Sequence, residues 1–313
     1  MENYTCCNAV LLLFFNRSDT TKRTLTQIAK VKPPRIYLAC DGARSANEAK
    51  AIAKLRQEII NNINWNCLIY TRFLEVNLGC KHAVSSAISW FFSHEDQGII
   101  LEDDCLPTIG FFRFCDELLE YYADNQQIMM ISGFSALGFC QATQKNLESS
   151  YYFSKYNHIW GWASWKRAWK HYALEQEDFT QEFTHFHFAS AREKRSWKKI
   201  FASYYAGKID TWDYPWTFSI WAANGLCIYP KYNMISNIGF NRDDATHTHG
   251  ESKFACMATH EITFPLIHPN TIAPNRVIDK KNFTIVFDQG ILARRIMRKI
   301  WKLIKSPKSQ PHR

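Results

Sequence analysis

Three adjacent carboxylates, Glu102, Asp103 and Asp104, follow directly after the apolar run at residues 99–101. Like charges this close repel one another, so an opposite charge must offset them. A hard divalent cation such as Mn²⁺ or Mg²⁺ takes oxygen ligands and commonly also holds phosphate groups. The triplet therefore predicts a metal-dependent site that handles phosphates, with a solvated acidic turn as the alternative.

The residues around the triplet indicate where it lies. A short apolar run between Gly98 and Pro107 is typical of a buried parallel strand. In open α/β sheets, ligands bind beyond the carboxyl ends of the strands. We therefore expect the three carboxylates at the mouth of a cleft.

The first half of the chain alternates between apolar runs and amphipathic segments. Strands are expected at residues 10–15, 35–40, 67–70 and 128–131, and helices at 20–30, 48–62, 80–92 and 111–123. This alternation predicts an α/β fold with a parallel sheet and right-handed crossovers.

The second half loses this alternation and becomes rich in aromatic residues. We expect one domain at residues 1–290, with a nucleotide-binding half at 1–135 and an acceptor half at 136–290. Within the second half, residues 178–206 are expected to be helical and 226–229 to form a strand.

Bulk properties limit the function classes. The chain has 313 residues, no apolar stretch long enough for a membrane span, and ten cysteines without metal-ligand spacing. The short apolar run near the N-terminus lacks the cationic flank and the cleavage site of a secretory signal. We therefore expect free thiols in a reducing cytosol.

The net charge of +9 is concentrated in residues 291–313, which contain eight Lys and Arg and no acid. The remaining chain holds 30 basic and 29 acidic residues, a balance that argues against a general nucleic-acid binder. On a helical wheel, six cations of residues 291–305 fall within an arc of roughly 140°, opposite Trp301 and the aliphatic residues. This pattern predicts a C-terminal amphipathic helix on an anionic membrane surface, or a terminal helix docked on the body.

The order of these features resembles the nucleotide-diphospho-sugar transferases of the GT-A fold over roughly residues 8–250. It is most similar to inverting N-acetylglucosaminyltransferases and to bacterial glycosyltransferases of surface-polysaccharide clusters. The segments that carry the resemblance are Phe15-Asn16-Arg17, Cys40-Asp41-Gly42, Glu102-Asp103-Asp104, Gly161-Trp162, Trp212-Asp213 and the late Gly239 and His247. The resemblance implies a Rossmann-like, mostly parallel sheet flanked by helices and an irregular, aromatic-rich acceptor half.

The resemblance implies that the acidic triplet binds the donor. Asp104 would ligate Mn²⁺ or Mg²⁺ in a DXD-like motif, Asp103 would meet the ribose, and Glu102 would meet the donor sugar. Such a cation stabilises the charge that develops on a nucleoside diphosphate leaving group.

Three residues outside the triplet are expected to complete the donor site. Asp41 would accept the imide N–H of a uracil, and Arg17 would lie against the base or the phosphates. Lys81, at the start of a helix, would add positive charge near the diphosphate. As alternatives, Arg17 and Asp41 form an ordinary ion pair, and Lys81 is solvated.

Inversion requires a general base on the acceptor side. Asp213 is the expected base, because it lies among aromatic residues in the half where acceptor sites lie in this fold. Asp210 is the reserve, since the chain departs from the resembling enzymes at Tyr214, where they have a second Asp. Trp160 and Trp162 are expected to stack on the acceptor sugar. The alternative is that Trp162, Trp165 and Trp169 form the buried face of a helix, since they are three and four residues apart.

His247 lies in the segment that closes over the diphosphate in such folds, where it would ligate the metal or touch a phosphate. The sequence thus predicts a metal-dependent glycosyltransferase on the cytoplasmic face of the membrane. It would move a sugar from a nucleotide-diphosphate donor, with UDP expected, to a glycan or lipid-linked acceptor. A metal-dependent nucleotidyltransferase or phosphoesterase and a non-catalytic membrane-bound module are the alternatives.

Overall fold

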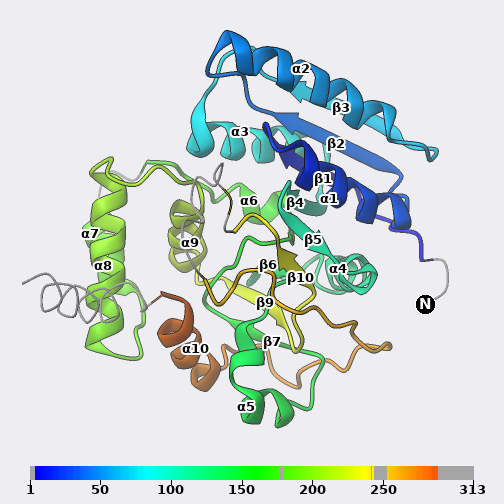
Figure 1. The fold of residues 1–313 in the computed structure, drawn as a ribbon. Helices are drawn as coiled ribbons and strands as arrows, with labels where there is room; N and C mark the ends of the chain where they lie inside the picture. The colour runs from blue at the N-terminus through cyan, green and yellow to red at the C-terminus, as the bar shows by residue number, and fades with distance from the viewer. Residues whose placement is uncertain (1–3, 176–178, 241, 243–251, 288–313) are drawn as a thin grey trace, which may run out of the picture.

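The computed structural model describes residues 4–175, 179–240, 242 and 252–287. Within these residues an eight-stranded sheet has the order β3-β2-β1-β4-β8-β6-β9-β7 (Figure 1). Its strands are β1 (Val10–Phe14), β2 (Arg35–Cys40), β3 (Leu68–Phe73), β4 (Gln97–Glu102), β6 (Ile128–Ser132), β7 (Tyr151–Ser154), β8 (Trp162–Trp165) and β9 (Leu226–Pro230). A separate antiparallel pair joins β5 (Cys105–Pro107) to β10 (Ile235–Asn237).

The crossovers in the first half are helices that the sequence predicted. They are α1 (Ser18–Val31), α2 (Ala46–Asn61), α3 (Gly79–His94) and α4 (Ile109–Tyr121). Helix α2 begins where the Ser45 side chain accepts a hydrogen bond from the Glu48 N–H, and its apolar face buries Ile52, Leu55 and Ile59.

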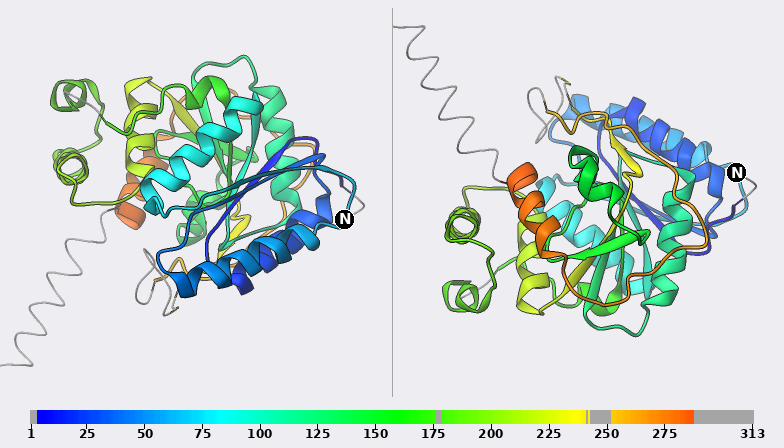
Figure 2. Two further views of the ribbon diagram at one scale, coloured as in Figure 1. Left: turned by 90° about the horizontal axis from the view of Figure 1, so that it is seen from above. Right: turned by 90° about the horizontal axis from the view of Figure 1, so that it is seen from below.

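The helices cover both faces of the sheet and bury one apolar core on each (Figure 2). Helices α1, α2 and α4 pack on one face, against residues such as Leu12 and Leu38. Helices α3, α6 (Lys166–Trp169) and α9 (Asp213–Ala222) pack on the other, against Leu11 and Leu13. The alternation of side chains along each buried strand produces this division.

The second half departs from the parallel pattern. Strand β8 lies antiparallel between β4 and β6, and β7 lies antiparallel beside β9. The Trp-rich segment is therefore a strand followed by one short helix, and not the long buried helix that the Trp spacing allowed. Trp165 and Trp169 are nevertheless packing residues, 3% and 5% exposed.

The remaining helices belong mainly to the second half. They are η1 (Ala136–Phe139), α5 (Gln141–Lys145), α7 (Phe179–Glu182), η2 (Phe183–His185), α8 (Ala191–Tyr205), α10 (Arg276–Asn282) and the π-helix η3 (Phe283–Phe287). Helices α7 and α8 lie at the periphery, beyond α9 as seen from the sheet (Figure 1).

The predicted α/β fold class, a mostly parallel sheet flanked by helices, is confirmed: four neighbouring strand pairs of the main sheet are parallel and three are antiparallel. The predicted amphipathic tail at residues 291–313 lies outside the described residues. Among the helices that the structure describes, none has the length and apolar content needed to cross a membrane.

Candidate functional site

The acidic triplet lies at the carboxyl edge of the sheet, as predicted. Strand β4 ends at Glu102, which is paired in register with Leu13 of β1. The Thr24 hydroxyl of α1 donates to the carbonyl oxygens of Asp103 and Cys105, at 3.1 and 3.3 Å. These bonds fix the backbone of the turn. Asp103 and Asp104 are each only 8% exposed, so their side chains are also held in place.

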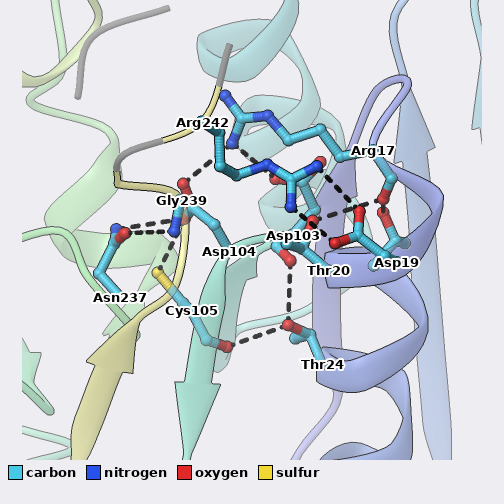
Figure 3. Close-up of polar contacts among 11 residues, drawn as sticks. Arg17, Asp19, Thr20, Thr24, Asp103, Asp104, Cys105, Asn237, Gly239 and Arg242 are labelled. Atoms are coloured by element: carbon cyan, nitrogen blue, oxygen red, sulfur yellow. Dashed lines mark hydrogen bonds and ion pairs between the residues drawn. The ribbon is translucent and has the colours of Figure 1, made fainter. Parts of the chain in front are cut away.

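Arg17 supplies positive charge to this turn (Figure 3). Its Nη1 lies 3.1 Å from Asp104 Oδ2 and 3.5 Å from Asp103 Oδ1. The alternative pairing of Arg17 with Asp41 is therefore wrong. Burial and the neighbouring Asp104 carboxylate raise the pKa of Asp103 to about 7, although the Arg17 guanidinium acts in the opposite direction.

Glu102 is the least compensated carboxyl of the triplet. Burial, followed by the charges of Asp104 and Asp103, raises its pKa well above the usual range. Its Oε1 atom is buried without a hydrogen-bond partner among the described residues. A buried acceptor without a partner is costly, so this atom is suited to a donor or a cation brought by a ligand.

The segment after β10 closes the other side of the turn. The Asn237 amide donates to Asp104 Oδ1 at 3.3 Å, and the Ile238 N–H donates to the Asp104 carbonyl at 2.9 Å. A Cβ atom on Gly239 would lie 2.2 Å from Asp104 Oδ2. Glycine is thus required here by close approach, and the chain continues to Arg242, which forms a two-point ion pair with Asp19 of α1 (Figure 3).

Asp41 lies at the end of β2 and holds the loop between β3 and α3. Its Oδ1 accepts from the backbone N–H groups of Gly42 and Leu78, and its Oδ2 accepts from the Asn77 amide and the Gly79 N–H. Gly79 itself has φ +74°, a conformation that favours glycine. Since these four bonds engage both oxygens, Asp41 could contact a nucleobase only by exchanging one of them, and that role stays a prediction.

Asp213 is the first residue of α9. The Thr211 hydroxyl donates to its Oδ1 at 2.5 Å. Burial raises the pKa of the Cys80 thiol, and the charges of Glu102, Asp213 and Asp210 raise it further. The structure thus brings Asp213, Asp210 and Glu102 close to Cys80, and the role of Asp213 as a base stays a prediction.

Three predicted binding residues, Trp160, Trp162 and Lys81, differ in whether their side chains line a pocket. Trp160 lines the pocket and packs edge-to-face against Phe240, so it remains available to a ligand. Trp162 is fully buried and stacks on Trp212 at 5.7 Å, so it cannot stack on an acceptor in this structure. Lys81 does not line the pocket, because its Nζ lies 4.7 Å above the ring of Tyr204 of α8.

One cavity of about 690 Å³ connects these groups. Its walls come from both halves of the chain: Arg17, Asp41 and the acidic triplet belong to the first half, and Trp160, Asp210 and Asp213 belong to the second. Sequence reasoning missed Arg72, Cys80 and Asn237, which also line it. Cys80 could have been found from the sequence, because it directly follows Asn77-Leu78-Gly79. Arg72 and Asn237 could not, because they reach the cavity only through the pairing of their strands.

The chemistry of these oxygen donors fits a hard cation. Asp103 and Asp104 offer carboxylate oxygens beside the unpartnered Glu102 Oε1, and Mn²⁺ and Mg²⁺ prefer such ligands. Within the described ranges, no group of three His, Cys, Asp or Glu side chains is arranged to hold a metal ion. His247 lies outside the described residues.

No protein-family model and no curated protein sequence matches the chain. Among solved structures, the chain is similar to the apo form of mouse xyloside xylosyltransferase 1, at 9% identity and a TM-score of 0.34, over 68% of this chain and 80% of that one. It is similar to an apo UDP-glucose pyrophosphorylase at 9% identity and a TM-score of 0.34, over 73% and 93%. A UDP-glucose pyrophosphorylase complexed with UDP-glucose has 11% identity and a TM-score of 0.24, over 47% and 62%. At these values the comparisons do not assign a function.

Proposed function

We propose that this chain is a metal-dependent glycosyltransferase that transfers a sugar from a nucleotide-diphosphate donor, with UDP as the expected nucleotide. The observation that carries the proposal is the shared cavity. Its lining combines the Glu102-Asp103-Asp104 carboxylates and Arg17 with two carboxylates of the other half of the chain, Asp210 and Asp213, of which we propose Asp213 as the base. Donor activation and acceptor deprotonation need such separate groups around one pocket.

In this proposal Asp104 would hold the metal ion, Mn²⁺ or Mg²⁺, which would supply positive charge to the leaving nucleoside diphosphate. Arg17 and Asn237 orient the Asp104 carboxylate through their contacts at 3.1 and 3.3 Å. Asp103 faces the ribose, and Glu102 accepts hydrogen bonds from the donor sugar through its unpartnered Oε1. His247 is proposed as a further metal or phosphate contact.

On the acceptor side, Asp213 removes the proton of the attacking hydroxyl, and transfer proceeds with inversion. Thr211 holds the Asp213 carboxylate through the 2.5 Å hydrogen bond, and Trp160 offers an aromatic face to the acceptor sugar. We propose a glycan or lipid-linked acceptor, with the enzyme peripheral on the cytoplasmic membrane face through residues 291–305.

A panel of nucleotide sugars tests this function. The protein is incubated with UDP-, GDP- and dTDP-linked sugars in Mn²⁺, in Mg²⁺ and in a chelator, and release of the nucleoside diphosphate is measured. We expect slow release from one donor class that requires the metal. Release of inorganic pyrophosphate from a nucleoside triphosphate and a sugar phosphate would instead identify a nucleotidyltransferase, and no turnover of any donor in any condition would oppose catalysis.

A further inference from the structure

Helix α8 has a strongly basic outer face. At about 100° per residue, its cations Lys194, Arg195, Lys198 and Lys199 fall on one side of the helix, and all four are exposed. Among the described residues, no acidic side chain lies within ion-pairing distance of these four. Glu193, the acid of this helix, is 2% exposed and lies on the opposite face.

The inner face fixes the orientation of α8. Glu193 Oε1 lies 2.5 Å from Lys155 Nζ, and Glu193 Oε2 accepts from the Ala189 N–H at 2.7 Å. Trp197 is fully buried, with its ring centroid 4.8 Å from that of Trp221 of α9. With an aromatic anchor and a buried ion pair on the inside, the four exposed cations lie on the outer face of the helix. Helix α8 itself lies at the periphery of the molecule (Figures 1 and 2).

The described chain ends beside this helix. The ring of Phe287 lies 5.0 Å from Trp197 and 4.9 Å from Tyr156. The sequence that follows Phe287 contains residues 291–313, which add eight Lys and Arg and no acid.

The same helix leads directly to the acceptor side of the pocket. Helix α8 ends at Tyr205, and the pocket lining resumes at Ile209, Asp210 and Thr211. Lys81 of α3 lies against the Tyr204 ring, so the end of α8 is packed close to the pocket wall. A surface that binds α8 would therefore lie near the entrance used by an acceptor.

We propose that the outer face of α8 docks on an anionic lipid bilayer. A straight helix with outward cations fits a planar anionic surface, and the tail sequence combines cations with Trp301 and aliphatic residues, which insert among lipids. A nucleic acid would also attract the cations, but it offers no apolar layer for Trp301 and the aliphatic residues of the tail sequence. Resting on the proposed function, docking through α8 presents the pocket to a lipid-linked acceptor.

The test uses the full chain and two charge-reversal variants. In the first, Lys194, Arg195, Lys198 and Lys199 are each replaced by Glu. In the matched control, the same change is made at Arg23, Lys30, Lys50 and Lys54, which are exposed on α1 and α2. Both variants have the same net charge, so a difference between them reports the location of the charge and not its total.

Co-sedimentation is measured with vesicles of phosphatidylcholine alone and with about 30% phosphatidylglycerol, at low and high salt. Each cation near an anionic surface strengthens binding about fivefold, so reversal on α8 should reduce the partition coefficient at least tenfold, and the control reversal less than threefold. Equal losses in both variants, or full binding by the α8 variant, would overturn the proposal. The proposal would also be overturned if the α8 variant lost binding to double-stranded RNA and kept its binding to vesicles.

Donor turnover in solution separates this inference from the proposed function. The α8 variant should release nucleoside diphosphate from the donor at the wild-type rate, since none of its four changed residues lines the pocket. Loss of vesicle binding with intact turnover supports the α8 surface. If the wild-type protein binds vesicles and has no turnover, the proposed function fails while the docking surface stands.

Discussion

The guanidinium of Arg17 lies 3.1 Å from the carboxylate of Asp104, and both side chains are largely buried at the carboxyl edge of the sheet. The pair joins the start of α1 to the end of β4. Since Asp103 and Glu102 crowd the same place, Arg17 offsets part of an excess of negative charge.

Replacing Asp104 by Asn should abolish metal-dependent donor turnover. The neutral amide keeps the shape of the side chain but is a poor ligand for a hard cation. The melting temperature should change little, because the lost Arg17 pair is offset by weaker repulsion with Glu102 and Asp103. Nucleoside diphosphate release and a thermal melt measure the two effects, and near-normal turnover in Mn²⁺ would refute the metal assignment.

Replacing Asp213 by Asn should lower the transfer rate by orders of magnitude and leave donor affinity nearly unchanged. A general base acts on the acceptor hydroxyl and not on the nucleotide. The matched control is Asp210→Asn, an exposed carboxylate of the same pocket. If the control alone loses transfer, the two roles must be exchanged, and a loss of donor binding in Asp213→Asn would put this residue in the donor site.

Replacing Gly239 by Ala should disturb the acidic turn by steric overlap. The new methyl group would lie 2.2 Å from Asp104 Oδ2, so either the carboxylate or the backbone must move. We expect a loss of about 1–3 kcal/mol in the free energy of unfolding and weaker metal-dependent ligand binding. Gly138→Ala is the control, because no atom lies within 4 Å of the added Cβ there. Equal denaturant midpoints for the two variants would contradict the account.

Replacing Asp41 by Asn should destabilise the loop between β3 and α3. The amide has one acceptor oxygen in place of two, and its NH₂ group would face the donors of Asn77 and Gly79. A hydrogen bond to a charged group contributes about 1.5–3 kcal/mol, so a loss of this size in the free energy of unfolding is expected. Urea unfolding measures it; an unchanged stability with a large rise in donor KM would favour the nucleobase role.

His158 should make the protein less stable in acid. Burial lowers its pKa to about 3 from 6.5, so between these values the unfolded state binds a proton that the folded state does not. Stability is therefore fully present above about pH 6.5 and falls as the pH decreases toward 3, by up to about 1.4 kcal/mol per pH unit. The unfolding free energy of the wild type should therefore fall relative to that of His158→Gln, by up to this slope, as the pH decreases from 7.5 to 5. A difference between the two proteins that does not change with pH would refute the prediction.

The apolar runs of the first half were sufficient to predict its strands and helices. Runs such as residues 10–14 and 35–40 are buried, and their order determines the crossovers. Strand β8 could not be predicted, because Trp162, Trp165 and Trp169 have helical spacing and because the strand is defined by pairing with β4 and β6, which are distant in sequence.

The same limit applies to the candidate site. Acidic residues directly after a strand indicated the carboxyl edge correctly, since the strand direction positions them. The partners of Asp41 and Lys81 depend on how separate elements pack, namely the β3–α3 loop for Asp41 and Tyr204 of α8 for Lys81. No local pattern in the sequence encodes these contacts.

The most direct measurement of the central claim is the melting temperature of wild type and Asp104→Asn with a nucleoside diphosphate, in Mn²⁺ and in a chelator. A ligand at a hundred times its dissociation constant stabilises the folded state by about 2.7 kcal/mol, which a thermal shift resolves. We expect UDP to raise the melting temperature of the wild type when Mn²⁺ is present and to have little effect in the chelator or on Asp104→Asn. An equal shift for both proteins in Mn²⁺, or no shift of the wild type with any nucleoside diphosphate, would contradict a metal-dependent nucleotide-sugar site at this turn.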